Sequence, residues 1–77
     1  MYYVYILRCA DGPYTGFSEN LKERFARHQN GGVPATKSRL PVELVFYSAF
    51  LDKYKAIEFE KYLKSGSGRA FMARHLF

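Results

Sequence analysis

The sequence predicts a small α/β (α+β) fold with the element order ββαβα and a short C-terminal helix. Three observations lead to this fold class. Two segments are rich in aromatic and β-branched residues, which favour strands. Two other segments begin at Asn20 and Asp52, residue types that cap helices. The chain has only 77 residues, so we expect residues 1–77 to form a single domain.

A hairpin is predicted at the N-terminus. Residues 2–9 form a continuous aromatic and β-branched run, which is typical of a central strand covered on both faces. Asp11 and Gly12 form a turn dipeptide, and residues 13–17 follow as a short second strand, antiparallel to the first. Tyr5 and Tyr14 lie on these paired strands and are able to meet on one face. By residue type alone, core packing with the hydroxyl at the edge is the favoured explanation of either tyrosine.

The first helix is predicted over residues 21–30. Asn20 and Glu23 form a capping-box pattern at its start, and Gly31 follows its end. Residues 31–41 are rich in Gly, Pro, Ser, Thr and basic side chains, which indicates a flexible connecting loop that can touch a ligand.

Residues 42–50 are again β-like and predict a third strand. Simple alternation along this strand places three apolar side chains on one face: Val42, Leu44 and Phe46. Asp52 is the expected N-cap of a second helix that runs to about Lys64, where Ser65 and Gly66 end it. Residues 69–76 are predicted to form a terminal helical turn or two.

Composition narrows the function classes. The single cysteine, Cys9, excludes an internal disulfide and a cysteine-rich zinc site, and favours a reduced, cytoplasmic protein. No apolar run approaches the roughly 20 residues of a membrane span, and no export signal is evident, so neither membrane nor secretion is predicted. Twelve basic and seven acidic side chains give a net charge of +5, which favours a polyanionic partner without identifying it.

Helical periodicity groups Arg24 and His28 in the first helix. Both fall on the same side as the apolar stripe formed by Leu21 and Phe25, whereas Arg27 points elsewhere. Arg24 and His28 therefore lie near the protein body, one turn apart. The spacing alone favours structural roles, because a histidine near a helix C-terminus is favoured by the helix dipole and an edge arginine commonly snorkels.

In the second helix, periodicity separates two glutamates. Glu60 is bracketed by Ile57 and Leu63 and lies within the apolar arc, whereas Glu58 projects to the opposite side. A carboxylate that is partly withdrawn from water needs a positive partner. Lys64 as a salt-bridge partner and a bound cation are both compatible with this position, and a hard ion such as Mg²⁺ suits one carboxylate with waters and phosphate oxygens.

These residues occur in an order that resembles the GIY-YIG nuclease superfamily. The first signature is Tyr3-Val4-Tyr5 and the second is Tyr14-Thr15-Gly16, followed by Arg24, His28 and Glu60. Further similarity to the small stand-alone, UPF0213-like members lies in three segments: residues 3–9, 40–45 and 63–69. The likeness therefore runs nearly end to end.

The resemblance implies a three-stranded antiparallel sheet flanked by helices and metal-dependent hydrolysis of nucleic acid. Glu60 would hold a single Mg²⁺ or Mn²⁺ ion, and Arg24 would neutralise the scissile phosphate. The hydroxyl of Tyr5 or Tyr14 would activate water, and His28 would orient or relay the proton. A phenol with a pKa near 10 is a poor base unless Arg24 or the metal lowers that value.

Tyr3, Val4 and Thr15 replace the glycine and the isoleucines of the name motif and keep strand character. Two other departures are more serious: Phe17 replaces a lysine of repair-nuclease relatives, and Met72 replaces an asparagine of several relatives. The expected contacts with nucleic acid come from four basic residues: Lys37, Arg39, Lys64 and Arg69. We expect an endonuclease that acts on DNA with single-stranded or branched features in repair or processing, with a homodimer as one arrangement. The alternative is a non-catalytic nucleic-acid-binding or adaptor module that retains the nuclease fold.

Overall fold

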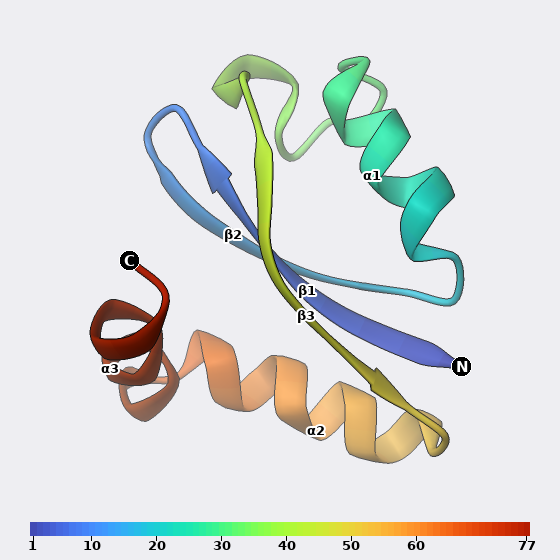
Figure 1. The fold of residues 1–77 in the computed structure, drawn as a ribbon, viewed down its shortest axis with the longest axis vertical. Coiled ribbons are helices and arrows are strands. Elements are labelled where there is room, and N and C mark those ends of the chain that lie inside the picture. Colours follow the sequence, from blue (N-terminus) through green and yellow to red (C-terminus); the bar gives the residue numbers. More distant parts are fainter.

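The computed structural model describes residues 1–77 and confirms the α+β class. In chain order the elements are β1 (Tyr2–Cys9), β2 (Gly12–Ser18), α1 (Leu21–Gln29), the 3₁₀ helix η1 (Lys37–Arg39), β3 (Glu43–Phe50), α2 (Lys53–Lys64) and α3 (Gly66–His75). The strands form one antiparallel sheet in the order β2-β1-β3. The sheet lies between two helical layers, with α1 and η1 on one side and α2 and α3 on the other (Figure 1). None of the helices has the length and apolar character needed to cross a membrane.

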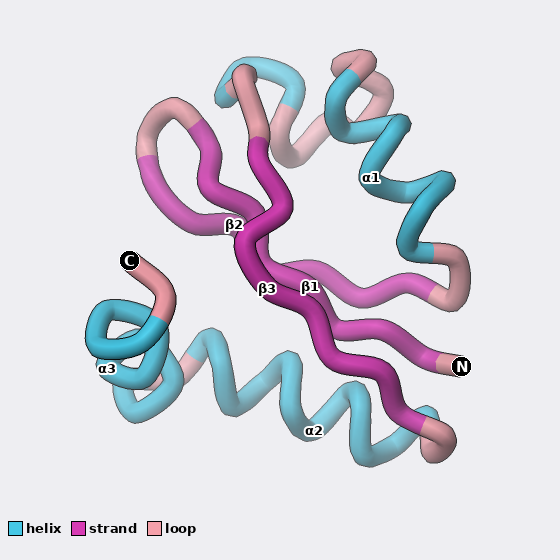
Figure 2. Tube along the Cα trace, viewed as in Figure 1, coloured by secondary structure: helices cyan, strands magenta, loops and turns pink.

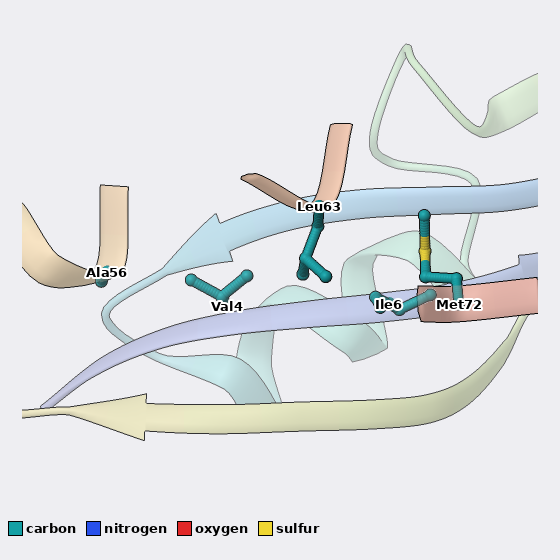
Figure 3. Close-up of a cluster of buried hydrophobic side chains, with 5 residues drawn as sticks. All are labelled: Val4, Ile6, Ala56, Leu63 and Met72. Atoms are coloured by element: carbon teal, nitrogen blue, oxygen red, sulfur yellow. The ribbon is translucent and has the colours of Figure 1, made fainter. Parts of the chain in front are cut away.

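Strand β1 lies between β2 and β3. Its successive side chains are therefore buried on opposite faces of the sheet. Figure 3 shows Val4 and Ile6 on the side of α2 and α3, where they pack with Ala56, Leu63 and Met72. All five are at most 5% exposed. This apolar cluster fixes α2 and α3 against the sheet, as the continuous apolar run in the sequence predicts.

The opposite face of β1 carries Tyr5, Leu7 and Cys9, which are also buried. Leu21 and Phe25 of α1 pack against them, so the predicted apolar stripe of this helix covers the second face. This packing fixes α1, which carries Arg24 and His28, against the face of β1 that carries Tyr5. Figure 2 shows that the sheet is strongly twisted between the two helical layers.

The simple alternation predicted for β3 is wrong. Leu7 of β1 pairs with Leu44, but the adjacent Ile6 pairs with Phe46, so Val45 is an extra residue that shifts the register. Such a bulge moves the following side chains to the other face. Leu44 consequently packs beside Tyr5, whereas Phe46 packs on the α2 and α3 side.

The C-terminal helix begins earlier than the sequence pattern indicates. Its start was predicted at Arg69, but α3 begins at Gly66, because the hydroxyl of Ser65 accepts a hydrogen bond from the backbone N–H of Gly68 at 3.3 Å. A side chain at Gly68 would overlap the backbone of Leu63, so this glycine allows α3 to pack closely against the end of α2.

The predicted flexible loop also contains ordered structure. Thr36 N donates to the carbonyl of Val33 at 3.1 Å, and Arg39 N donates to the carbonyl of Thr36 at 2.9 Å. Val33 and Thr36 are buried, at 7% and 0% exposure. The segment after α1 is therefore a packed connection, and it brings a threonine to the second face of the sheet.

Candidate active site

The structure brings the predicted catalytic residues together from four elements. Tyr5 comes from β1, Tyr14 from β2, Arg24 and His28 from α1, and Glu60 from α2. The charges of Tyr14, Arg24 and Glu60 all act on the ionisation of Tyr5, and the charge of Arg24 also acts on that of His28. The five groups thus share one electrostatic environment although they span much of the chain.

A buried hydrogen-bonded chain forms the centre of this cluster. The hydroxyl of Tyr5 lies 2.8 Å from Nε2 of His28, and Nδ1 of His28 lies 2.7 Å from Oγ1 of Thr36. Tyr5 is 1% exposed, and His28 and Thr36 are fully buried. Each polar group of this chain therefore has a partner, as burial requires. Thr36 was not anticipated, because it lies in a segment that the sequence pattern presents as a loop.

Gly16, the last residue of the second signature, provides the space for Tyr5. The two residues are directly paired across β1 and β2, and a Cβ atom at Gly16 would overlap the ring and hydroxyl of Tyr5. A glycine at this position therefore lets the phenol lie flat across the neighbouring strand and reach His28. The sequence motif has a steric explanation that is independent of any reaction.

Tyr14 lies at the outer side of the buried chain. Its ring centroid is 5.2 Å from that of His28 and 6.4 Å from that of Tyr5. Tyr14 is half-buried, and its hydroxyl takes part in none of the side-chain hydrogen bonds of the structure, in contrast to that of Tyr5. The two tyrosines therefore differ: the hydroxyl of Tyr5 is used internally, and the hydroxyl of Tyr14 is free to contact a ligand.

Burial controls the protonation of the Tyr5 and His28 pair. Removal from water raises the pKa of Tyr5 well above 10, and the nearby Tyr14 and Glu60 act in the same direction. Arg24 lowers this pKa, as expected from the sequence, but its effect is smaller than that of burial. Burial, assisted by Arg24, lowers the pKa of His28 below 6.5. Both side chains are therefore neutral at neutral pH, and the expectation that Arg24 gives an acidic tyrosine is not met for Tyr5.

Arg24 is a partly buried cation without an internal counter-ion. Three ion pairs occur in the structure, and Arg24 takes part in none of them. Its charge lies close enough to Tyr5 and His28 to shift the pKa of each. A guanidinium in this position is suited to bind an anion with paired hydrogen bonds.

Glu60 is withdrawn from water as the helical phase predicts, whereas Glu58 is exposed. The Glu60 side chain is 22% exposed and forms an ion pair with Lys64, whose Nζ lies 3.2 Å from Oε2. The predicted salt-bridge partner is therefore in place. Lys64 is 57% exposed, and such pairs along a helix surface contribute only about 0.3–0.5 kcal/mol.

Glu60 offers a single carboxylate to a divalent ion, whose other ligands would be waters and substrate phosphates. The structure contains no group of three or more His, Cys, Asp or Glu side chains that would enclose an ion. Mg²⁺ commonly binds through one or two carboxylates and substrate phosphates, and it keeps several waters. Glu60 is a carboxylate of this type, because its weak bond to Lys64 leaves it free to exchange partners.

The four basic residues expected to contact nucleic acid do not lie together. The Arg39 guanidinium forms an ion pair with Asp11 and hydrogen bonds to the carbonyl of Pro13, so it holds the turn between β1 and β2. Lys37 is exposed on η1. Lys64 and Arg69, in contrast, line one common cleft beside Tyr14.

The two departures from the family pattern are explained by packing. Phe17 stacks on Tyr2 with ring centroids 6.3 Å apart and joins the apolar cluster beneath α2. Met72 is 5% exposed and belongs to the same cluster. Both side chains therefore contribute to the core on the α2 and α3 side of the sheet.

Comparison with known proteins identifies relatives of the whole fold. The family model described as the GIY-YIG catalytic domain matches residues 1–73. A UPF0213 protein of Lacticaseibacillus paracasei is 46% identical over 65 residues, covering 82% of this chain and 73% of the relative. A UPF0213 protein of Clostridium perfringens is 46% identical over 66 residues, covering 83% and 71%. The solution NMR structure of the UPF0213 protein of Bacillus halodurans superposes with a TM-score of 0.60 at 35% identity, covering 96% of this chain and 84% of that one.

Proposed function

The chain belongs to the GIY-YIG catalytic-domain family of nucleases, and from this premise we propose that it is a divalent-metal-dependent endonuclease that cleaves DNA. One observation carries the proposal. An arginine without a counter-ion, Arg24, lies close enough to the neutral Tyr5 and His28 pair to act on the pKa of both, and Glu60 lies close enough to act on that of Tyr5. A phosphate-binding group, a proton acceptor and a metal-binding carboxylate are the three components that phosphodiester hydrolysis requires.

Arg24 binds the scissile phosphate in this proposal. Its guanidinium neutralises the charge that develops on the phosphoryl oxygens, and it can do so without breaking an internal ion pair. Tyr14, whose ring lies 5.2 Å from that of His28, offers its hydroxyl to position the attacking water.

The proton of that water passes through Tyr5 to His28. The oxygen of Tyr5 accepts the proton while its own hydroxyl proton moves to Nε2 of His28, which lies 2.8 Å away. The phenol is unchanged and His28 becomes an imidazolium whose Nδ1–H donates to Oγ1 of Thr36. Because the pKa of His28 is below its ordinary value, the neutral imidazole needed to receive the proton is the prevailing form at neutral pH.

Glu60 holds the metal ion in this proposal. A divalent cation at this carboxylate would supply charge neutralisation at the phosphoryl and leaving oxygens. With a cation at Glu60, the Lys64 ammonium would be free to contact a neighbouring phosphate of the same strand. Replacement of Lys64 by a cation at Glu60 would cost little free energy, because the ion pair between the two side chains is partly exposed.

The proposed substrate is DNA recognised by structure and not by base sequence, in repair or processing. Lys64 and Arg69 offer phosphate contacts beside the site, and phosphate contacts carry no sequence information. A fold of this size has little surface for reading base edges in a duplex.

The experiment compares cleavage of plasmid, branched and single-stranded DNA in Mg²⁺, Mn²⁺ or EDTA. Arg24→Ala is tested against Arg27→Ala, an exposed arginine on the same helix. The proposal expects metal-dependent cleavage that Arg24→Ala abolishes and Arg27→Ala retains. Equal losses in both variants would argue against a phosphate site at Arg24. Binding without cleavage on every substrate would favour a non-catalytic module.

A further inference from the structure

A cleft of about 680 Å³ opens beside the candidate active site. One wall is the start of β2 at Tyr14, and the other walls are the end of α2 at Lys64 and the outer turns of α3 at Met72 and Ala73. Figure 1 shows α3 and the C-terminal residue at this end of the sheet. The volume is within the range of pockets that hold small ligands, about 300–1,000 Å³.

The cleft and the candidate active site share residues. Tyr14 lines the cleft, and its ring lies 5.2 Å from that of His28. Lys64 also lines it, and its Nζ is bonded to the carboxylate of Glu60. A nucleotide in the cleft would therefore be next to the one whose phosphate is cleaved.

The chemistry of the cleft combines an apolar interior with cations. Leu63 and Met72 form buried apolar walls, and the ring of Phe77 adds an aromatic surface. Lys64 and Arg69 contribute two exposed basic groups. An apolar slot with two cations is complementary to a planar base attached to a phosphate.

We propose that this cleft binds one unpaired nucleotide of the DNA strand, with its base against Met72 and Ala73 and its phosphate at Lys64 and Arg69. The proposal rests on the nuclease function proposed above and gives it a substrate class. A base within a duplex is stacked and paired, so only an unpaired or displaced base can enter. Apart from Tyr14 and Thr15, the uncharged lining is apolar, so we expect little preference among the four bases.

Two alanines of α3 provide a matched test. Ala73 lines the cleft and Ala70 does not, and both are exposed on the same helix. Ala73→Trp fills the cleft, whereas Ala70→Trp adds the same side chain outside it. Binding of a fluorescein-labelled oligothymidylate is measured by anisotropy in EDTA, so that no cleavage occurs, with circular dichroism melts to verify folding.

Ala73→Trp should weaken binding of the oligothymidylate about tenfold, and Ala70→Trp should change it less than about twofold. An otherwise identical strand with abasic sites should bind the wild type as weakly as the normal strand binds Ala73→Trp. Binding of a blunt duplex should be the same in all three proteins. Titration of the wild type with oligothymidylate should also shift the Met72 methyl resonance.

Equal affinities for Ala73→Trp and Ala70→Trp, or an unchanged Met72 resonance, would overturn the nucleotide site. The result is separable from the nuclease proposal because binding is measured without turnover. A wild type that binds through the cleft but cleaves no DNA supports the nucleotide site and rejects the nuclease. If Ala73→Trp cleaves gapped DNA at the wild-type rate, the nuclease proposal is supported and the nucleotide site is rejected.

Discussion

At the scale of single residues, the hydroxyl of Tyr5 has two functions in this account. It is the hydrogen-bond partner of Nε2 of buried His28, and it passes the proton of the attacking water to that nitrogen during hydrolysis. Tyr5→Phe should lower the cleavage rate by about a hundredfold or more, which is typical of lost acid–base catalysis. It should also reduce the free energy of unfolding by about 1–3 kcal/mol, because Nε2 loses its partner.

The matched control is Tyr3→Phe on the same strand, whose hydroxyl is not part of the buried chain. It should leave cleavage and stability nearly unchanged. Single-turnover cleavage and urea unfolding measure the two quantities. A Tyr5→Phe protein that is destabilised but cleaves at the wild-type rate would show that the buried chain is only structural.

The lowered pKa of His28 predicts a pH dependence. Below pH 6.5 the unfolded chain binds a proton at this histidine more readily than the folded chain does, so the free energy of unfolding falls as pH decreases from about 6.5 to the folded pKa. Cleavage should fall as pH decreases through the folded pKa itself, because the neutral imidazole is lost there. The difference in unfolding free energy between wild type and His28→Gln, measured from pH 7.5 to 4.5, isolates this contribution from those of the carboxylates.

A pH-independent difference between those two proteins would contradict the assignment of a buried neutral imidazole. The acid limb of the cleavage profile should also have an apparent pKa below 6.5. A limb above that value would identify another group as the proton acceptor.

Helical periodicity was enough to place several of these residues. It put Arg24 and His28 on the covered side of α1, and it distinguished the withdrawn Glu60 from the exposed Glu58. Thr36 could not be placed in this way, because its hydrogen bond to His28 depends on the path of the connection after α1. The dominance of burial over Arg24 at Tyr5 likewise depends on packing that a sequence pattern does not contain.

At the scale of elements, the contact between α2 and α3 shapes the cleft. A Cβ atom at Gly68 would overlap the backbone of Leu63, whereas one at Gly66 meets open space. Gly68→Ala should therefore cost about 1–3 kcal/mol of unfolding free energy through overpacking. Gly66→Ala should be neutral or stabilise the protein by up to about 1 kcal/mol, because it restricts the unfolded chain.

Thermal and urea unfolding of the two variants measure this difference. Nucleotide binding should weaken in Gly68→Ala, since displacement of α3 changes the position of Met72. Equal stability of the two variants would indicate that α3 is not held against the end of α2 as described.

A bulge within β3 and the start of α3 show the limits of local patterns. Alternation failed in β3 because a bulge at Val45 depends on pairing with β1, which single-strand periodicity does not encode. The sequence pattern places the start of α3 too late, because Ser65 indicates the end of α2 but is also the N-cap of α3. The hairpin, the capped start of α1 and the capped start of α2 depend on local signals, and these were predicted correctly.

At the scale of the whole molecule, the net charge is +5, but the basic residues differ in whether they line the cleft. Lys64 and Arg69 line the cleft, whereas Arg39 is bonded to Asp11. Lys64→Gln and Arg69→Gln should each reduce the slope of log K against log salt by about 0.7 for single-stranded DNA. Arg39→Gln should leave this slope unchanged and lower stability instead.

Fluorescence anisotropy at a series of salt concentrations measures the slopes. A reduced slope for Arg39→Gln, without a reduction for Lys64→Gln or Arg69→Gln, would place the bound strand on the other side of the hairpin turn.

The order of elements and the family were accessible from the sequence because they depend on motifs and short-range signals. The cleft was not, because it is formed by β2, the end of α2 and α3, which are far apart in the chain. The central claim nevertheless depends on a residue that the sequence identified, Glu60.

The most direct measurement is metal-dependent cleavage of one DNA substrate by the wild type, Glu60→Gln and Glu58→Gln. The two variants remove the same charge from positions two residues apart on α2, one facing the site and one exposed. We predict that Glu60→Gln loses cleavage at every Mg²⁺ and Mn²⁺ concentration, while Glu58→Gln cleaves at the wild-type rate. Cleavage by Glu60→Gln at the wild-type rate, or equal losses in both variants, would contradict the assignment of Glu60 as the metal-binding residue of a nuclease.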